Sequence, residues 1–127
     1  AAVVLNAARA DRIERRIANN NDDCDQVPGE QPDLDGNNLS IGNSGFGGSA
    51  NSAVGLRFTD LRIPRFSTIS AAVVTFHPEA ATDSTPPDVL IQGEGVGNAQ
   101  GFQQVADNLL GRPRTQASVA WNNIANW

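Results

Sequence analysis

The sequence predicts an all-β protein, an antiparallel β-sandwich of the jelly-roll kind. Three observations favour this class. Short segments rich in Val, Ile, Phe and Leu recur through the second half of the chain, Gly- and Pro-containing turns separate them, and no long segment has unambiguous helical periodicity. The 127 residues suit one domain large enough to bury a core. No apolar run is long enough to span a bilayer as a helix, so we expect no membrane insertion.

Residues 1–18 form an N-terminal extension with two interpretations. Seven residues fall near helical spacing (Leu5, Ala8, Arg9, Arg12, Ile13, Arg16 and Ile17), which would give a helix. The run Val3-Val4-Leu5 would serve equally well as an extended strand, including one donated to a neighbouring chain. The β-sandwich module is expected over residues 19–127.

Residues 19–52 are a turn-rich lead-in to the module, because Asn, Asp, Gly and Pro dominate them. Leu39 and Ile41 predict a short strand within this region. The Gly/Ser run that follows contains Phe46, which would either pack on the core or make an exposed contact.

Residues 53–127 are expected to supply the core strands. Val54, Leu56 and Phe58 alternate with Gly55, Arg57 and Thr59, which predicts a strand with the first three on the dry face and the second three on the wet face. This strand continues through Leu61 and Ile63 until Pro64 ends it. Residues 69–76 are apolar on both faces and predict a central strand, residues 88–93 and 117–121 predict two more, and residues 99–110 predict a helical turn.

The charge balance excludes one class of partner. The chain has ten Asp and four Glu against nine Arg, with no Lys and no Tyr, and a net charge of −5. Proteins that bind nucleic acid concentrate cations to neutralise phosphates. We therefore expect no nucleic-acid partner.

Acidic residues raise the question of calcium. Asp22, Asp23, Asp33 and Asp35 supply hard oxygen donors of the kind that calcium prefers. The spacing fails the EF-hand pattern, since alignment on Gly36 places Gln31 first and Gly42 last in the loop. The other interpretation is that these side chains cap turns. No cofactor is required on either interpretation.

Candidates for catalysis are few. His77 is the sole histidine and stands at a predicted strand end, so a triad or zinc site has no visible partner for it. Cys24 is the sole cysteine, and the carboxylates beside it should raise its pKa and weaken it as a nucleophile. Its alternative role is a disulfide to another chain. We expect no catalytic site.

Two further features bear on surface contacts. Trp121 is expected in the core, whereas Trp127 is the better candidate for stacking on a sugar or for an interface, together with Phe46. Asn38-Leu39-Ser40 is an N-glycosylation sequon.

An ordered set of segments resembles a jelly-roll-like β-sandwich module found in large secreted and surface-anchored proteins and similar to carbohydrate-binding domains. The likeness covers roughly residues 18–127 and is densest at 53–76 and 112–121. The residues that resemble the module are 54–64, 69–76, 90–94 and 117–121, with Asp22-Asp23, Asp33-Leu34-Asp35, Asn98-Ala99, Phe102, Arg112 and Thr115. The resemblance implies an extracellular or cell-surface location.

Such modules continue past the Trp-containing segment with strands that close the sandwich, whereas the sequence here stops at Trp127. Either neighbouring chains supply those strands or they belong to another part of the same polypeptide. The function expected is a non-catalytic structural subunit of a fibre, sheath or adhesive surface protein that associates with itself or with other extracellular chains. The alternative is a module that tethers a secreted protein to polysaccharide.

Overall fold

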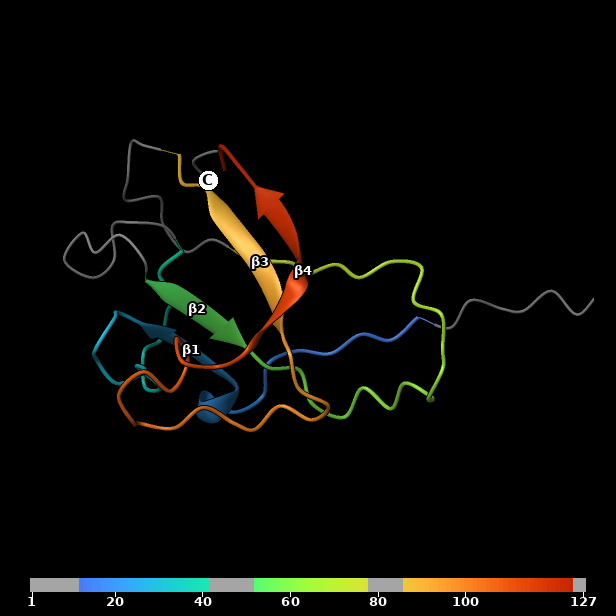
Figure 1. The fold of residues 1–127 in the computed structure, drawn as a ribbon, viewed down its shortest axis with the longest axis horizontal. Helices are drawn as coiled ribbons and strands as arrows, with labels where there is room; N and C mark the ends of the chain where they lie inside the picture. The colour runs from blue at the N-terminus through green and yellow to red at the C-terminus, as the bar shows by residue number, and fades with distance from the viewer. Residues whose placement is uncertain (1–11, 42–51, 78–85, 125–127) are drawn as a thin grey trace, which may run out of the picture.

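The computed structural model describes residues 12–41, 52–77 and 86–124 (Figure 1). In chain order, its elements are a 3-10 turn η1 (Asn20–Asp22) and strands β1 (Asp23–Gln26), β2 (Ala53–Leu56), β3 (Val89–Glu94) and β4 (Arg114–Trp121). The described residues contain two antiparallel strand pairs and no α-helix, in agreement with the all-β class. Among these residues, no helix has the length or apolarity that a membrane crossing needs.

The strands form two separate antiparallel pairs. In the first pair, Asp23 of β1 lies opposite Leu56 of β2, and Gln26 lies opposite Ala53. In the second pair, Val89 of β3 lies opposite Trp121 of β4, and a register shift between Gln92 and Glu94 brings Glu94 opposite Arg114. The sandwich that would join such pairs into two stacked sheets stays a prediction.

Strands β3 and β4 agree with the predictions for residues 88–93 and 117–121, although β4 begins earlier, at Arg114. Strand β1 was not predicted. Its sequence, Asp-Cys-Asp-Gln, has low intrinsic β-propensity, and the residues on either side of it predict turns rather than a strand. The strand that was expected at Leu39 and Ile41 is absent, and Asp33 makes the isolated bridge to Asp25 instead.

The buried core lies between β1, β2 and the loop of residues 98–112. Its apolar members in the described chain are Cys24 and Phe102, and its polar members are Asp22, Asp25 and Gln26. Pro32, in the loop after β1, and Ile124, whose N–H donates to the Pro87 carbonyl at 3.1 Å, are also buried. Within the 98–112 loop, the Gly111 N–H donates to the Asp107 carbonyl at 2.8 Å, which is the hydrogen bond of a single helical turn, so the helical turn expected over 99–110 is found at residues 107–111. The core is therefore small and depends on hydrogen bonds as well as on apolar contact.

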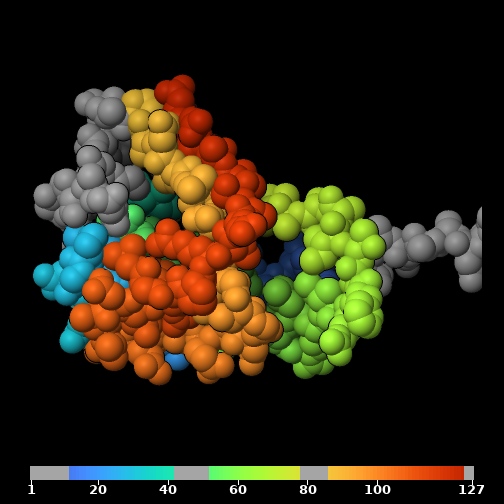
Figure 2. Space-filling view, viewed as in Figure 1, coloured from blue at the N-terminus to red at the C-terminus, as the bar shows by residue number. Residues whose placement is uncertain are grey.

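Residues 57–77, hereafter the arm, contradict the sequence prediction. They were expected to continue the β2 strand to Ile63 and to form a central strand over 69–76, but they pair with no described strand. Positive φ angles at Asp60 and Arg62 (54° and 50°), together with Pro64, interrupt the extended geometry that the predicted strand to Ile63 requires. Residues 69–76 have no hydrogen-bonded partner strand among the described residues. Figure 2 shows the arm, in yellow-green, as a lobe beside the rest of the molecule.

The predicted alternation of dry and wet faces is not seen along β2 and the residues after it, since Val54, Leu56 and Phe58 are half-buried, as Arg57 and Thr59 are. Gly55, assigned to the wet face, is the buried residue of the strand, whereas Val54 and Leu56 are half-buried. The Phe102 ring packs against the backbone at Gly55. A Cβ atom on residue 55 would stand only 2.5 Å from Cζ of that ring. Only glycine allows this close approach of ring to backbone.

Candidate functional site

An ion pair ties three parts of the chain together at Asp22. An Arg57 Nη1 atom lies 2.5 Å from Asp22 Oδ1, and Asn19 Nδ2 donates to Asp22 Oδ2 at 3.0 Å. Arg57 Nε also donates to the carbonyl of Ala99 at 2.9 Å. The hydrogen bond from Asn19, followed by the contact with Arg57, lowers the pKa of Asp22 against the opposing effect of burial. Both carboxylate oxygens of Asp22 therefore already have donors from the protein.

Asp25 and Asp33 organise the next loop. The Asp33 N–H donates to the Asp25 carbonyl at 2.9 Å, and the Ser40 N–H donates to Asp25 Oδ2 at 3.1 Å. Asp33 Oδ1 accepts the N–H groups of Asp35 and Gly36 at 3.0 and 3.1 Å. Burial, more than the nearby charge of Asp33, raises the pKa of Asp25. Turn capping is thus a structural role that Asp33 fulfils.

The four calcium candidates occupy two neighbouring parts of the chain. Asp22 and Asp23 adjoin each other at the start of β1, where burial and then the charge of Asp22 raise the pKa of Asp23. Asp33 and Asp35 belong to the exposed loop after β1. Over residues 12–41, 52–77 and 86–124, no group of three or more His, Cys, Asp or Glu is placed to hold a metal ion. Calcium binding stays a prediction.

Arg112 has a structural role that the sequence did not reveal. Its guanidinium lies 3.0 Å from Glu94 Oε2 and donates to the carbonyls of Gln100 and Gly101 at 2.7 and 2.9 Å. Its Cζ atom lies 4.4 Å from the centroid of the Phe102 ring. Arg112 belongs to the segments that carry the family resemblance, but sequence spacing alone could not show that it closes the 98–112 loop.

Gln26 is a second residue whose role was missed. Its Oε1 atom accepts the N–H groups of Leu109 and Leu110 at 2.8 and 3.0 Å, and its Nε2 atom donates to the Glu30 carbonyl. The side chain is buried. An amide can accept and donate at once, which is why Gln26 can join β1 to two loops.

Exposed apolar side chains are the strongest candidate for a functional surface. On the arm, Phe66 is 93% exposed and Val73 is 85% exposed. On the β3–β4 pair, Leu90 and Val119 are 61% and 62% exposed. Further exposed members of this set are Leu61, Ile63, Ile69, Val74 and Ile91. Apolar surface of this extent on two neighbouring elements is typical of an interaction site.

Trp121 connects the arm to the β3–β4 pair. Its ring stacks on that of Phe76 with centroids 6.0 Å apart and planes 25° apart. The residue is half-buried rather than in the core as expected. The contact places the end of the arm beside the end of β4.

Other predicted residues divide between described and undescribed parts. Trp127, Phe46 and the assembly strand Val3-Val4-Leu5 lie outside the described residues. The sequon asparagine, Asn38, is exposed in the loop after β1, and His77 is exposed at the end of the arm. Cys24 is 1% exposed, and burial, more than the neighbouring carboxylates, raises the pKa of its thiol to about 12.

Comparison with protein-family models, with curated protein sequences and with solved structures finds no match in any of the three. The fold and the exposed surface alone define the class of this protein: a small all-β chain with an extended arm whose apolar side chains are exposed.

Proposed function

We propose that this chain is a non-catalytic structural subunit of an extracellular fibre, sheath or adhesive surface, joined to its neighbours by strand and face contacts. The observation that carries the proposal is the arm. Its apolar side chains face solvent, and between residues 68 and 77 its backbone makes no hydrogen bond to another described residue. A strand from a neighbouring chain would satisfy the backbone and cover the side chains together.

Two residues support the part of the proposal that the protein is not catalytic. Cys24 is buried, and its raised pKa keeps it a thiol near neutral pH. His77, the sole histidine of the sequence, is exposed rather than set in a cleft with carboxylates. The residues best able to start nucleophilic or acid–base chemistry are thus poorly placed for it.

Sedimentation velocity over a roughly hundredfold range of concentration tests the proposal. We expect the mean sedimentation coefficient to rise with concentration. Val73→Ser should weaken association by about tenfold, since burying a valine side chain contributes about 1.5 kcal/mol. Val96→Ser is the matched control, because Val96 is exposed outside the arm.

A chain that sediments as a monomer throughout this range would contradict the proposal. If that monomer bound polysaccharide, and Trp127→Ala abolished the binding, the carbohydrate-binding alternative would replace it. That alternative rests on Trp127 and Phe46, which lie outside the described residues.

A further inference from the structure

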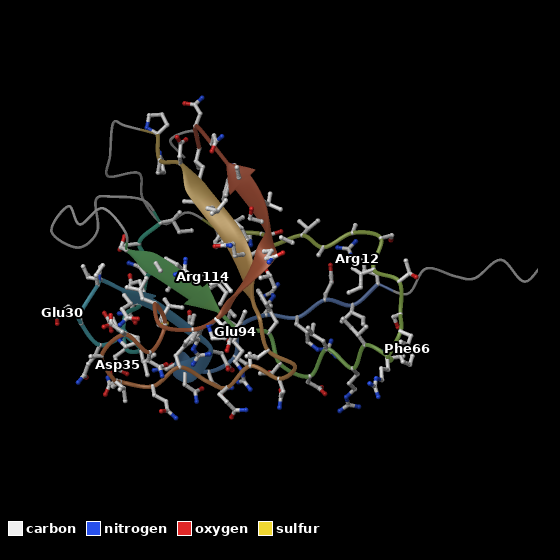
Figure 3. The ribbon with its side chains drawn as sticks, in the orientation of Figure 1. Arg12, Glu30, Asp35, Phe66, Glu94 and Arg114 are labelled. Carbon is white, nitrogen blue, oxygen red and sulfur yellow. The ribbon has the colours of Figure 1, made fainter. Side chains whose placement is uncertain are left out.

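The two ends of the molecule carry opposite charge. The basic end, defined as residues 12–16 and 60–66, has two carboxylates, Glu14 and Asp60, against five arginines: Arg12, Arg15, Arg16, Arg62 and Arg65. The acidic end, defined as residues 27–41 and 103–108, has no Lys or Arg and four exposed carboxylates: Glu30, Asp33, Asp35 and Asp107. Figure 3 shows Arg12 and Phe66 toward one extreme of the long axis, and Glu30 and Asp35 toward the other.

Hydrogen bonds hold the two segments of each end together. Arg15 Nε donates to the Asp60 carbonyl at 3.0 Å, which joins residues 12–16 to the arm. At the acidic end, the Asp107 N–H donates to the Glu30 carbonyl at 3.0 Å, and Asp107 Oδ1 accepts the Gly29 N–H at 2.9 Å. Each end is therefore a continuous surface assembled from segments far apart in sequence.

Ion pairs within the basic end do not cancel its charge. Arg12 pairs with Glu14, while Arg15 and Arg62 share Asp60. Arg16 and Arg65 make no ion pair with a described carboxylate, and Arg65 lies over the Phe66 ring with its Cζ atom 5.2 Å from the centroid. Exposed pairs of this kind contribute little to stability, so their arginines can exchange partners at low cost.

Each end also combines its charge with exposed apolar side chains. Ile13, Ile63 and Phe66 are exposed at the basic end, and Val105 is exposed at the acidic end beside Asp107. An apolar centre with a charged rim is the usual composition of a protein–protein interface. Phe66, with Arg65 over its ring, is the best candidate for the central anchor.

We infer that the basic end of one copy docks on the acidic end of the next copy, an inference that rests on the proposed function and names its partner. Contact between two basic ends would bring arginines together and is electrostatically unfavourable. Because the two docking surfaces differ, every added copy leaves one basic end and one acidic end free. Such a heterologous contact propagates into a filament unless its rotation closes a ring.

A charge-swap mixing experiment tests the inference on the full chain. One variant carries Arg62→Glu and Arg65→Glu, and the other carries Glu30→Arg and Asp35→Arg; all four side chains are exposed. Each variant alone should need more than about tenfold higher concentration than the native chain to associate, since each swap removes the attraction between the two ends and brings charges of the same sign into the contact. An equimolar mixture should associate again, because the native basic end of one variant then meets the native acidic end of the other, and the two swapped ends meet each other.

Arg65→Gln compared with Arg114→Gln is the matched control, because Arg114 is exposed on β4, away from both ends (Figure 3). Only Arg65→Gln should weaken association. The native contact should also weaken as salt is raised from about 0.05 to 0.5 M.

Two results would overturn the inference in distinguishable ways. If the native chain associates and both swapped variants associate as well as it does, head-to-tail docking is wrong while the structural-subunit proposal stands. If the native chain never associates, both fail. Circular dichroism of each variant shows whether lost association reflects lost folding. Association regained in the mixture would show independently that both variants are folded.

Discussion

At the residue scale, Cys24 is the group whose chemistry the fold changes most. Burial raises the pKa of its thiol from 9.0 to about 12. The sequence has no Lys and no Tyr, the other side chains that ordinarily lose a proton in this range. Between pH 9 and pH 12, Cys24 is therefore the only side chain expected to lose a proton on unfolding.

The alkaline stability of the protein should follow from this one thiol. The unfolded chain releases the Cys24 proton near pH 9, whereas the folded chain keeps it, so the free energy of unfolding should fall as pH rises. The expected slope is about 1.4 kcal/mol per pH unit. Urea unfolding in reductant between pH 8.5 and 11 measures the slope. Cys24→Ala should abolish it, and an equal slope in that variant would refute the assignment.

Gly55 is the second residue with a sharp requirement. Gly55→Ala would place a Cβ 2.5 Å from Phe102 Cζ and 2.9 Å from Leu109 Cδ1, so the variant should lose about 1–3 kcal/mol of stability. Gly97→Ala is the control, since a Cβ at Gly97 meets nothing within 4 Å, and should change stability by less than about 1 kcal/mol. Thermal melts compare the two. Phe102→Leu in the Gly55→Ala background should recover part of the loss, and equal melts for both glycine variants would contradict the packing described.

At the scale of elements, β1 depends on its side chains more than on its strand propensity. Asp25 accepts the Ser40 N–H, and Gln26 accepts two N–H groups from the 98–112 loop. Both side chains are buried and hydrogen-bonded. Removal of either would leave a backbone donor without its partner.

Gln26→Leu measures that dependence. It keeps side-chain bulk but leaves the N–H groups of Leu109 and Leu110 without an acceptor, and should cost about 2–4 kcal/mol. Hydrogen exchange at these two amides should accelerate. Gln104→Leu, at an exposed position in the same loop, should leave both stability and exchange nearly unchanged. Slow exchange at Leu109 and Leu110 in the Gln26 variant would show that another group satisfies them.

Sequence periodicity predicted the two strands in which local apolar side chains indicate an extended conformation. Strands β3 and β4 contain β-branched residues such as Val89, Ile91 and Val119, and both were predicted near their observed bounds, although a register shift between Gln92 and Glu94 interrupts their pairing. Strand β1 was missed because its stabilising partners, Ser40, Gly55 and the Leu109 amide, lie far away in sequence. The arm was predicted as strand because its apolar residues are strand-like, although left-handed backbone at Asp60 and Arg62 interrupts its first part.

The candidate site was predictable only in its general character. Exposed apolar surface was expected from a sandwich without closing strands, but residues 69–76 were predicted as a central strand, and their exposure on an arm was not predicted. The hydrogen-bond roles of Arg112 and Gln26 depend on the path of the 98–112 loop, which no local pattern determines. The acidic residues around β1 were recognised as a cluster, while their partners, Asn19 and Arg57 among them, were not.

At the scale of the whole molecule, the described core is small and the exposed apolar surface is large. The buried apolar residues of the described chain include Cys24, Pro32, Phe102 and Ile124, whereas Phe66, Val73, Leu90 and Val119 are exposed. Burying such side chains is the main favourable contribution to association. Assembly would therefore bury at contacts between copies the apolar surface that one copy leaves exposed.

The most direct measurement is hydrogen–deuterium exchange of the arm amides at two concentrations of the native chain. Residues 68–77 should exchange almost freely in dilute solution. At concentrations where sedimentation detects assemblies, the same amides should slow by more than about tenfold, because a neighbouring backbone accepts their hydrogen bonds. Arm amides that stay freely exchanging within assemblies, or that are already protected in the dilute monomer, would contradict the account.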